Sequence, residues 1–224
     1  MKKYSLILTT LLLMSAGVAN AGLVTFDFQG GCSSSCGLDG PNGNTRVFSE
    51  GGVELSVNAF AEDGNSNTTA FLGHFGSGLG ITNRNEGNGS GSRHVVDNSG
   101  TFEWARFMFD QDVIVESVLL RVFDGNEADI SYLVGAFNSN FGSWSTQEGN
   151  RNDPPGGNAA LLTLNNDASS NFFRLAAEYG ENNDDFKIAA ITVRTPMIDV
   201  AEPLPLGLLG LGLLALAVTR RKQQ

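Results

Sequence analysis

The chain has 224 residues and a formal net charge of −10, with 24 acidic residues against 14 basic ones. All the acidic residues lie between Asp27 and Glu202, and five of the basic ones lie outside these limits, so this segment carries nine basic residues and has a net charge of −15. A surface this acidic repels nucleic acid and anionic lipid, which excludes DNA or RNA as a partner. Without its two ends the chain keeps about 180 residues, enough for one domain with a hydrophobic core.

Residues 1–21 have the three parts of a secretory signal peptide. Two lysines follow the initiating methionine, an apolar run covers most of 6–14, and small residues occupy the positions that signal peptidase reads, ending at Ala21. We predict cleavage after Ala21 and export of a mature chain that begins at Gly22. A retained membrane anchor is the alternative, which the short apolar run and the cleavage site disfavour.

Cys32 and Cys36 are the two cysteines of the chain and lie among serines and glycines. In an oxidising compartment this spacing predicts a disulfide that closes a short loop and stabilises the fold only a little. A redox-active pair would more typically have Cys-x-x-Cys spacing. A metal site would need further ligands, and both histidines of the chain lie far away in sequence.

The central part of the chain is dominated by short apolar and alternating patterns that predict β-strands. The segment 172–179 also fits helical spacing, and Gly51-Gly52 suits the tight turn of a hairpin. We predict a turn at Asp110-Gln111-Asp112 between two long central strands. About nine such strands besides the ambiguous 172–179, with Gly, Asn and Asp turns, predict an all-β domain over 22–199, an antiparallel β-sandwich of the jelly-roll type. The expected strands are 23–29, 46–50, 53–60, 70–75, 101–109, 113–123, 130–137, 159–164, 172–179 and 185–194.

No pattern in the domain predicts catalysis. Asp97 follows His94 by three residues, which in a strand places the two side chains on opposite faces. We interpret His94 as a surface histidine beside a glycine-rich loop. A pair of catalytic carboxylates contributed by separate strands cannot be identified from spacing, so a secreted hydrolase stays open as an alternative to a protein that is not an enzyme.

Loops rich in oxygen ligands follow several predicted strands and suit Ca²⁺ better than any other cofactor. The candidate ligands are Asp124, Asn126 and Asp129, and a second acidic loop covers 181–185. None of these loops matches an EF-hand, and Asp and Asn side chains that cap ordinary turns explain the same composition. We therefore expect at most a structural Ca²⁺ and no other cofactor.

Trp144 is the best candidate for a sugar contact, because it lies in a polar loop where an exposed ring could stack on a carbohydrate. A loop aromatic can equally be a lid that packs on its own domain. Trp104 falls inside a predicted strand and is expected in the core.

The last segment, 200–224, begins with a short polar stretch, continues with the apolar run 204–218 and ends with the basic residues 220–222. An apolar helix of about 15 residues spans roughly 25 Å, which is marginal for a bilayer core of about 30 Å. The positive-inside rule keeps the basic end in the cytoplasm and the domain outside. We predict a single transmembrane helix, with a permanent anchor and a removable tail as the two possibilities.

This tail resembles the PEP-CTERM protein-sorting domain of Gram-negative bacteria. The likeness is carried by Glu202-Pro203, by the run Leu-Leu-Gly-Leu-Gly-Leu-Leu over 208–214, and by Arg220 and Arg221. Ala201 stands where the family has the first proline of its Pro-Glu-Pro motif. The resemblance implies recognition by an exosortase, a membrane-embedded peptidase-like enzyme that cuts near Glu202-Pro203.

Proteins of this class are linked to exopolysaccharide, biofilm or floc matrices. The resemblance therefore implies a protein held first in the inner membrane and then delivered to the cell surface or the extracellular matrix. We expect a structural or adhesive role there, after processing by signal peptidase and exosortase. A carbohydrate-binding module of the matrix is the first alternative, with exopolysaccharide as its partner, and a secreted hydrolase is the second.

Overall fold

The computed structural model describes residues 22–31, 43–63, 66–86, 94–98, 101–123, 128–135, 140–149, 152–153, 158–181 and 184–196. In these segments the chain is all-β, apart from one turn of 3-10 helix, η1 (Phe141–Ser143). The strands are β1 (Leu23–Asp27), β2 (Thr45–Glu50), β3 (Val53–Asp63), β4 (Ser66–Thr69), β5 (Phe71–Phe75), β6 (Gly78–Thr82), β7 (Val96–Asp97), β8 (Phe102–Val122), β9 (Ile130–Val134), β10 (Ser145–Gln147), β11 (Asn152–Asp153), β12 (Ala159–Thr163), β13 (Ser170–Ala177) and β14 (Asp185–Arg194). The predicted all-β fold is confirmed.

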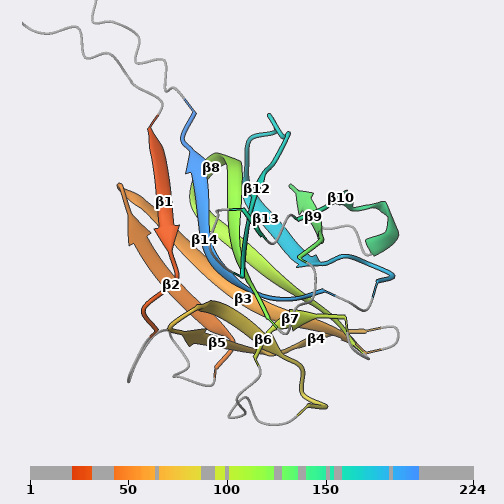
Figure 1. Ribbon diagram of the computed structural model, residues 1–224. Helices are drawn as coiled ribbons and strands as arrows, with labels where there is room; N and C mark the ends of the chain where they lie inside the picture. Colours follow the sequence, from red (N-terminus) through yellow and green to blue (C-terminus); the bar gives the residue numbers. More distant parts are fainter. Residues whose placement is uncertain are drawn as a thin grey trace, which may run out of the picture. The chain divides into compact units, whose positions relative to one another are not determined.

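The 14 described strands form one continuous hydrogen-bonded sheet, and strand β8, 21 residues long, joins its two parts, which we call the two sheets (Figure 1). The first half of β8 pairs with β3 and β13, in a sheet that continues through β2 on one side and β9 and β10 on the other. Its second half pairs with β12 and β14, and β1, β6 and β7 add to β14. The pairings of the described strands are antiparallel, except for the two-residue pair β11–β12.

The predicted turn at Asp110-Gln111-Asp112 is wrong, because β8 runs through these residues without a break. The polar side chains mark the place where the strand passes from one sheet to the other. Asp110 is exposed there, and its Oδ1 accepts a hydrogen bond from the backbone N–H of Glu54. The register of β13 shifts between Ser170 and Phe172, opposite the same stretch of β8.

The hairpin of β2 and β3 forms as the sequence predicts. Glu50 pairs with Val53, and Gly51 and Gly52 between them have φ angles of 54° and 81°. Two residues with positive φ are what a tight two-residue hairpin turn requires. The segment 172–179 also fits helical spacing, but its residues 172–177 belong to strand β13.

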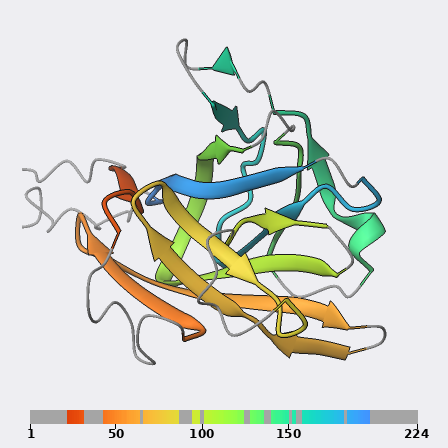
Figure 2. The ribbon, with the colours of Figure 1, turned by 60° about the horizontal axis from the view of Figure 1, so that its bottom comes forward.

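One hydrophobic core lies between the inward faces of the two sheets. Figure 2 shows β14 in one layer and β2 and β3 in the other. Every second residue of β3 and of the first half of β8 points into this core, as the period of a half-buried strand requires. Five phenylalanines have at most 1% of their surface exposed, and each contributes about 1.5 to 3 kcal/mol by burial. They are Phe26, Phe28, Phe107, Phe173 and Phe186.

The two ends of the described domain lie side by side on neighbouring strands. Leu23 of β1 pairs with Arg194 of β14. The backbone N–H of Gly22 donates to Oγ1 of Thr195 at 3.3 Å, and the N–H of Thr195 donates to the carbonyl of Gly22 at 3.1 Å. The first and the last strand of the described domain are therefore neighbours in the sheet.

Gly80 lies inside the buried strand β6, and a Cβ added to it would lie 1.9 Å from the carbonyl oxygen of His94. We expect Gly80→Ala to lower the free energy of unfolding by about 2 to 3 kcal/mol, because the obstacle is backbone. Gly76→Ala is the matched control, since Gly76 is exposed and its Cβ would meet nothing within 4 Å. Urea unfolding of both variants tests this, and equal losses would contradict it.

Candidate functional site

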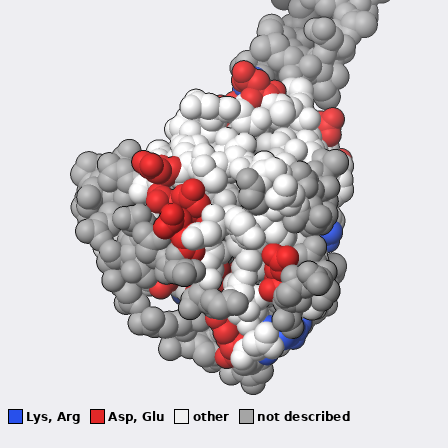
Figure 3. Space-filling view, turned by 90° about the vertical axis from the view of Figure 1, so that its right-hand side faces the viewer, with Lys and Arg blue, Asp and Glu red and all other residues white. Residues whose placement is uncertain are grey.

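Acidic side chains gather where β13 ends and β9 begins. Five of them influence one another there, and we call this group the acidic end. On the side of the molecule seen in Figure 3, acidic side chains form patches with few lysines or arginines among them. The members of the acidic end are Asp129, Glu148, Glu178, Glu181 and Asp184.

Antiparallel pairing brings the acidic end together. Ala177, at the end of β13, pairs with Ile130, at the start of β9, so the loops beyond these residues meet. The backbone N–H of Asp129 donates to Oδ1 of Asp184 at 2.9 Å. Two oxygen-rich loops that the sequence predicts separately, around Asp129 and over 181–185, are thus in contact.

The segment 140–149 also contacts the acidic end. The backbone N–H of Gly149 donates to Oδ1 of Asp129 at 2.6 Å. A Cβ on Gly149 would lie 2.4 Å from the carbonyl oxygen of Ala128, so this close approach requires glycine. The segment 140–149 is thereby fixed to the loop that precedes β9.

Asp184 is the buried member of the acidic end. Only 2% of its surface is exposed, and its Oδ2 atom has no hydrogen-bond partner among the described residues. Burial raises the pKa of Asp184 from 3.8 to about 7. Burial also raises the pKa of Glu178, and the negative charges of neighbouring carboxylates raise it further.

Asp129 is the one Ca²⁺ candidate that the structure describes, since Asp124 and Asn126 lie outside the described residues. Within the described segments, no three or more His, Cys, Asp or Glu side chains are arranged to hold a metal ion. The Asp129 carboxylate instead accepts the hydrogen bond from Gly149. A structural Ca²⁺ stays a prediction of the sequence.

Trp144 packs on the outer face of the sheet formed by β8 and β13. It is 4% exposed, and its ring centroid lies 5.2 Å from that of Phe141 and 6.1 Å from that of Trp104. The turn η1 places Phe141 and Trp144 together, and Phe102 completes this aromatic cluster. The packing favours the lid alternative for Trp144, because its ring does not present a face to solvent. Trp104 is 3% exposed in the same cluster.

Tyr179 is the exposed aromatic residue at this place, and the sequence interpretation missed it. It is 49% exposed, and its ring meets Phe102 edge-on at 5.2 Å and stacks on Phe141 at 6.1 Å. Its position directly after β13 and before Gly180 is a signal that could have identified it, because side chains in turns between strands face solvent. An aromatic ring held rigidly at the surface can stack on a sugar.

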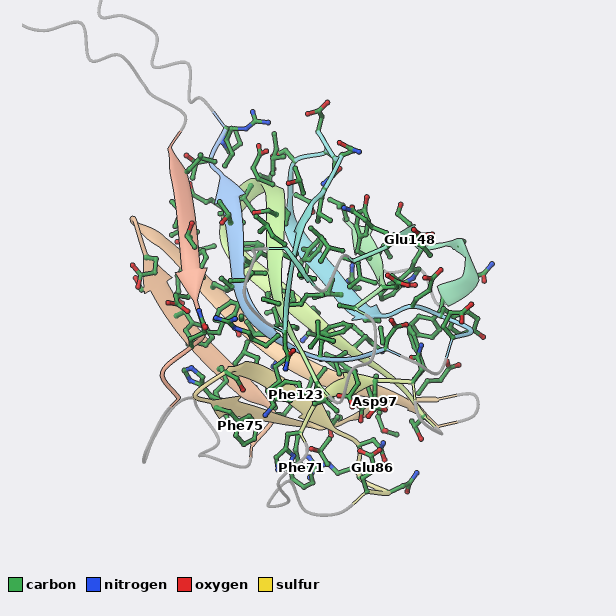
Figure 4. The ribbon with its side chains drawn as sticks, viewed as in Figure 1. Phe71, Phe75, Glu86, Asp97, Phe123 and Glu148 are labelled. Carbon is green, nitrogen blue, oxygen red and sulfur yellow. The ribbon has the colours of Figure 1, made fainter. Side chains whose placement is uncertain are left out.

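Carboxylates from separate strands also meet at Glu103 of β8. Burial raises the pKa of Glu103 well above its usual value, and the nearby charges of Asp97 and Glu86 raise it further (Figure 4). The Nδ2 group of Asn83 donates to its Oε1 at 3.1 Å. Glu103 is fully buried, so this group is a polar part of the core and is not open to a substrate in the described structure.

The prediction that His94 lies on the surface is wrong. Only 2% of its surface is exposed, its Nδ1 is hydrogen-bonded to Oγ1 of Thr82, and its ring stacks on Phe75 at 4.9 Å. The reason is the close approach of the backbone at Gly80, which holds the residue against β6.

The remaining predicted site residues have no described structure. They are Ala21, Cys32, Cys36, Glu202, Pro203, Arg220 and Arg221. The described segments contain no cysteine, so the disulfide stays a prediction.

The roles of Trp144 and Tyr179 can be separated by stability. We expect Trp144→Ala to lower the free energy of unfolding by about 3 kcal/mol, because it leaves a cavity beneath the segment 140–149. Tyr179→Ala removes a half-exposed ring and should cost less than about 1 kcal/mol. Chemical denaturation measures both, and a negligible loss for Trp144→Ala would show that its ring is not a packed lid.

The raised pKa of Asp184 makes stability depend on pH. The unfolded chain ionises this group near pH 3.8 and the folded domain near pH 7, so the free energy of unfolding falls as the pH rises between these values. Asp184→Asn removes this loss. At pH 8 in the presence of a chelator we expect it to be about 2 to 4 kcal/mol more stable than the wild type.

The gain from Asp184→Asn should nearly vanish at pH 3.5, where Asp184 is protonated in the folded state and mostly protonated in the unfolded state. Asp112→Asn removes one negative charge from an exposed position of β8 and controls for net charge. A gain at pH 8 that is equal in the two variants would contradict the role assigned to burial of Asp184.

The functional assignment of the tail rests on its own residues, which lie outside the described segments. The described segments contain no helix that is long and apolar enough to cross a membrane. Comparison of the chain with protein-family models, curated proteins and solved structures finds no match.

Proposed function

We propose that the chain is an exported protein that is delivered to the cell surface or extracellular matrix by its C-terminal tail, and that it acts there as a structural or adhesive component without catalysis. Signal peptidase would release it at Ala21. An exosortase would then act near Glu202-Pro203, at the start of a transmembrane helix over 204–218. The domain between these places would be a jelly-roll-type sandwich.

The observation that carries the proposal is the extent of the compact unit, Gly22–Pro196. Its first residue is the one that follows the predicted signal cleavage. Its last residue precedes the sorting motif by only a few positions. Met1–Ala21 and Met197–Gln224, which hold the two predicted addresses, are not part of this unit.

The pairing of β1 with β14 supports the same proposal. The hydrogen bonds between Gly22 and Thr195 close the last rung of this pair. Cleavage before Gly22 or near Glu202 would therefore remove none of the described strands and no residue of the described core. A domain that loses both terminal segments without loss of packing suits a protein processed at both ends.

The acidic surface favours solubility, and this supports a role outside the cell. The net charge of −15 between the ends disfavours anionic lipid and nucleic acid as partners. A neutral or sparsely charged exopolysaccharide meets no such repulsion and is the proposed matrix partner.

Intact-mass spectrometry of the protein recovered from its own cells tests the sorting step. We expect the wild-type cells to yield a chain that begins at Gly22 and ends close to Glu202. Cells that lack the exosortase should yield a chain that still reaches Gln224, because the tail is then not cut. A terminal peptide through Lys222 in both strains would rule out sorting by this route.

The variant Glu202→Ala tests in the same measurement whether the acidic residue of the motif is needed for cleavage. We expect it to give the uncut mass in wild-type cells. Asp199→Ala is its control, because it removes one negative charge three residues before the motif and should be cut normally.

A further inference from the structure

Two arginines lie side by side on the outer face of the sheet that contains β3, β8, β13 and β9. Arg106 of β8 pairs directly with Arg174 of β13, with Asn58 of β3 on one side and Leu133 of β9 on the other. We call these four residues the arginine row. Their side chains point away from the core, because the residues before and after each of them pack into it or against it.

Like charges directly opposite each other destabilise an antiparallel pair. Arg174 is 5% exposed and Arg106 is half-buried, so water screens their repulsion poorly. Burial lowers the pKa of both guanidinium groups, and the charge of Arg106 lowers the pKa of Arg174 further. In a domain whose surface is acidic, this local positive charge has the sign that attracts an anion.

The guanidinium of Arg106 keeps a donor that no described residue uses. Its Nη2 donates to Oδ1 of Asn58 at 3.1 Å, but its buried Nε has no hydrogen-bond partner among the described residues. Arg106 also forms no ion pair with a carboxylate of the described residues. A planar guanidinium of this kind is suited to bind a carboxylate through two parallel hydrogen bonds.

Aromatic rings flank the arginine row on both sides along the strands. Phe60 is half-buried, stacks on Trp104 at 4.4 Å, and has the Cζ atom of Arg106 at 4.9 Å from its ring centroid. Phe172 lies on the other side, with the Cζ atom of Arg174 at 5.8 Å. Partly exposed rings beside fixed hydrogen-bond donors are the elements of a sugar-binding surface.

We propose that the arginine row binds the carboxylate of a sugar acid within a glycan, with the neighbouring sugar rings against Phe60 and Phe172. The net charge of −15 disfavours a polymer with a carboxylate on every sugar, because its remaining charges would face the acidic surface. The ligand is therefore a glycan with isolated carboxylates. The inference rests on the proposed function only in taking this glycan from the extracellular matrix.

Isothermal titration of the full chain, purified in detergent, tests the proposal with three hexasaccharides. One consists of β-linked glucose, the second is the same chain with a single glucuronate, and the third is glucuronate throughout. We expect the second to bind at least tenfold more tightly than the first. We also expect it to bind more tightly than the third at low ionic strength, with the difference shrinking as salt is added.

Two variants separate charge from geometry. Arg106→Gln should abolish the preference for the single carboxylate, and Arg106→Lys should keep only part of it, since lysine retains the charge without the planar fork. Arg121→Gln is the matched control, because Arg121 is partly buried on the outer face of the other sheet and hydrogen-bonded to Gln29. It should bind like the wild type.

Thermal unfolding of each variant confirms that the domain is folded before titration. Equal binding of the neutral and the singly charged hexasaccharide by the wild type, or an undiminished preference in Arg106→Gln, would overturn the proposal. The titration uses purified protein, so its failure leaves the cellular sorting experiment unaffected. Failure of sorting likewise leaves the binding result standing.

Discussion

The fold depends on one strand that takes part in both sheets. At about 3.3 Å per residue, the 21 residues of β8 would reach roughly 70 Å if the strand were straight. Register shifts in its partners lie near its change of sheet, in β13 between Ser170 and Phe172 and in β14 between Thr192 and Val193. Because both halves of β8 send alternate side chains inward, the strand ties the two inward faces to one core. A break in β8 would separate the layers that this core requires.

The buried acidic groups of this protein lie where strands end. Asp184 and Glu103 are both buried carboxyl groups beside other carboxylates, and burial raises the pKa of each. Antiparallel pairing places the ends of strands beside the starts of their neighbours, so loops with Asp and Glu from distant parts of the sequence are forced together. Antiparallel pairing therefore also creates the unfavourable contacts between carboxyl groups at these strand ends.

Several of the described cations of the domain lie over aromatic rings. The Cζ atom of Arg84 lies 3.6 Å from the ring centroid of Phe71. Lys187, the single lysine between the two ends of the chain, has its Nζ atom 4.3 Å from the ring centroid of Phe75 and 4.9 Å from that of Phe123. The labelled rings of Figure 4 show where these contacts lie in the lower part of the domain. Cation–π attraction partly compensates these groups for lost hydration, and Arg106 and Arg174 of the arginine row also lie beside rings, those of Phe60 and Phe172.

The sequence alone determined the all-β class, most of the longer strands, the β2–β3 hairpin and the alternation that builds the core, because these follow from local periodicity and from glycines with positive φ. It did not predict the short strands β4, β6, β7, β10 and β11. The two terminal addresses are also predictions of the sequence alone, because their signals are runs of apolar and charged residues that need no fold. Tertiary structure decided the rest. The passage of β8 between sheets, the burial of His94 and Trp144, the meeting of Asp129 with Asp184, and the pairing of Arg106 with Arg174 all depend on which strands lie side by side. Register between strands far apart in the chain fixes these neighbours, and no spacing within one strand contains that information.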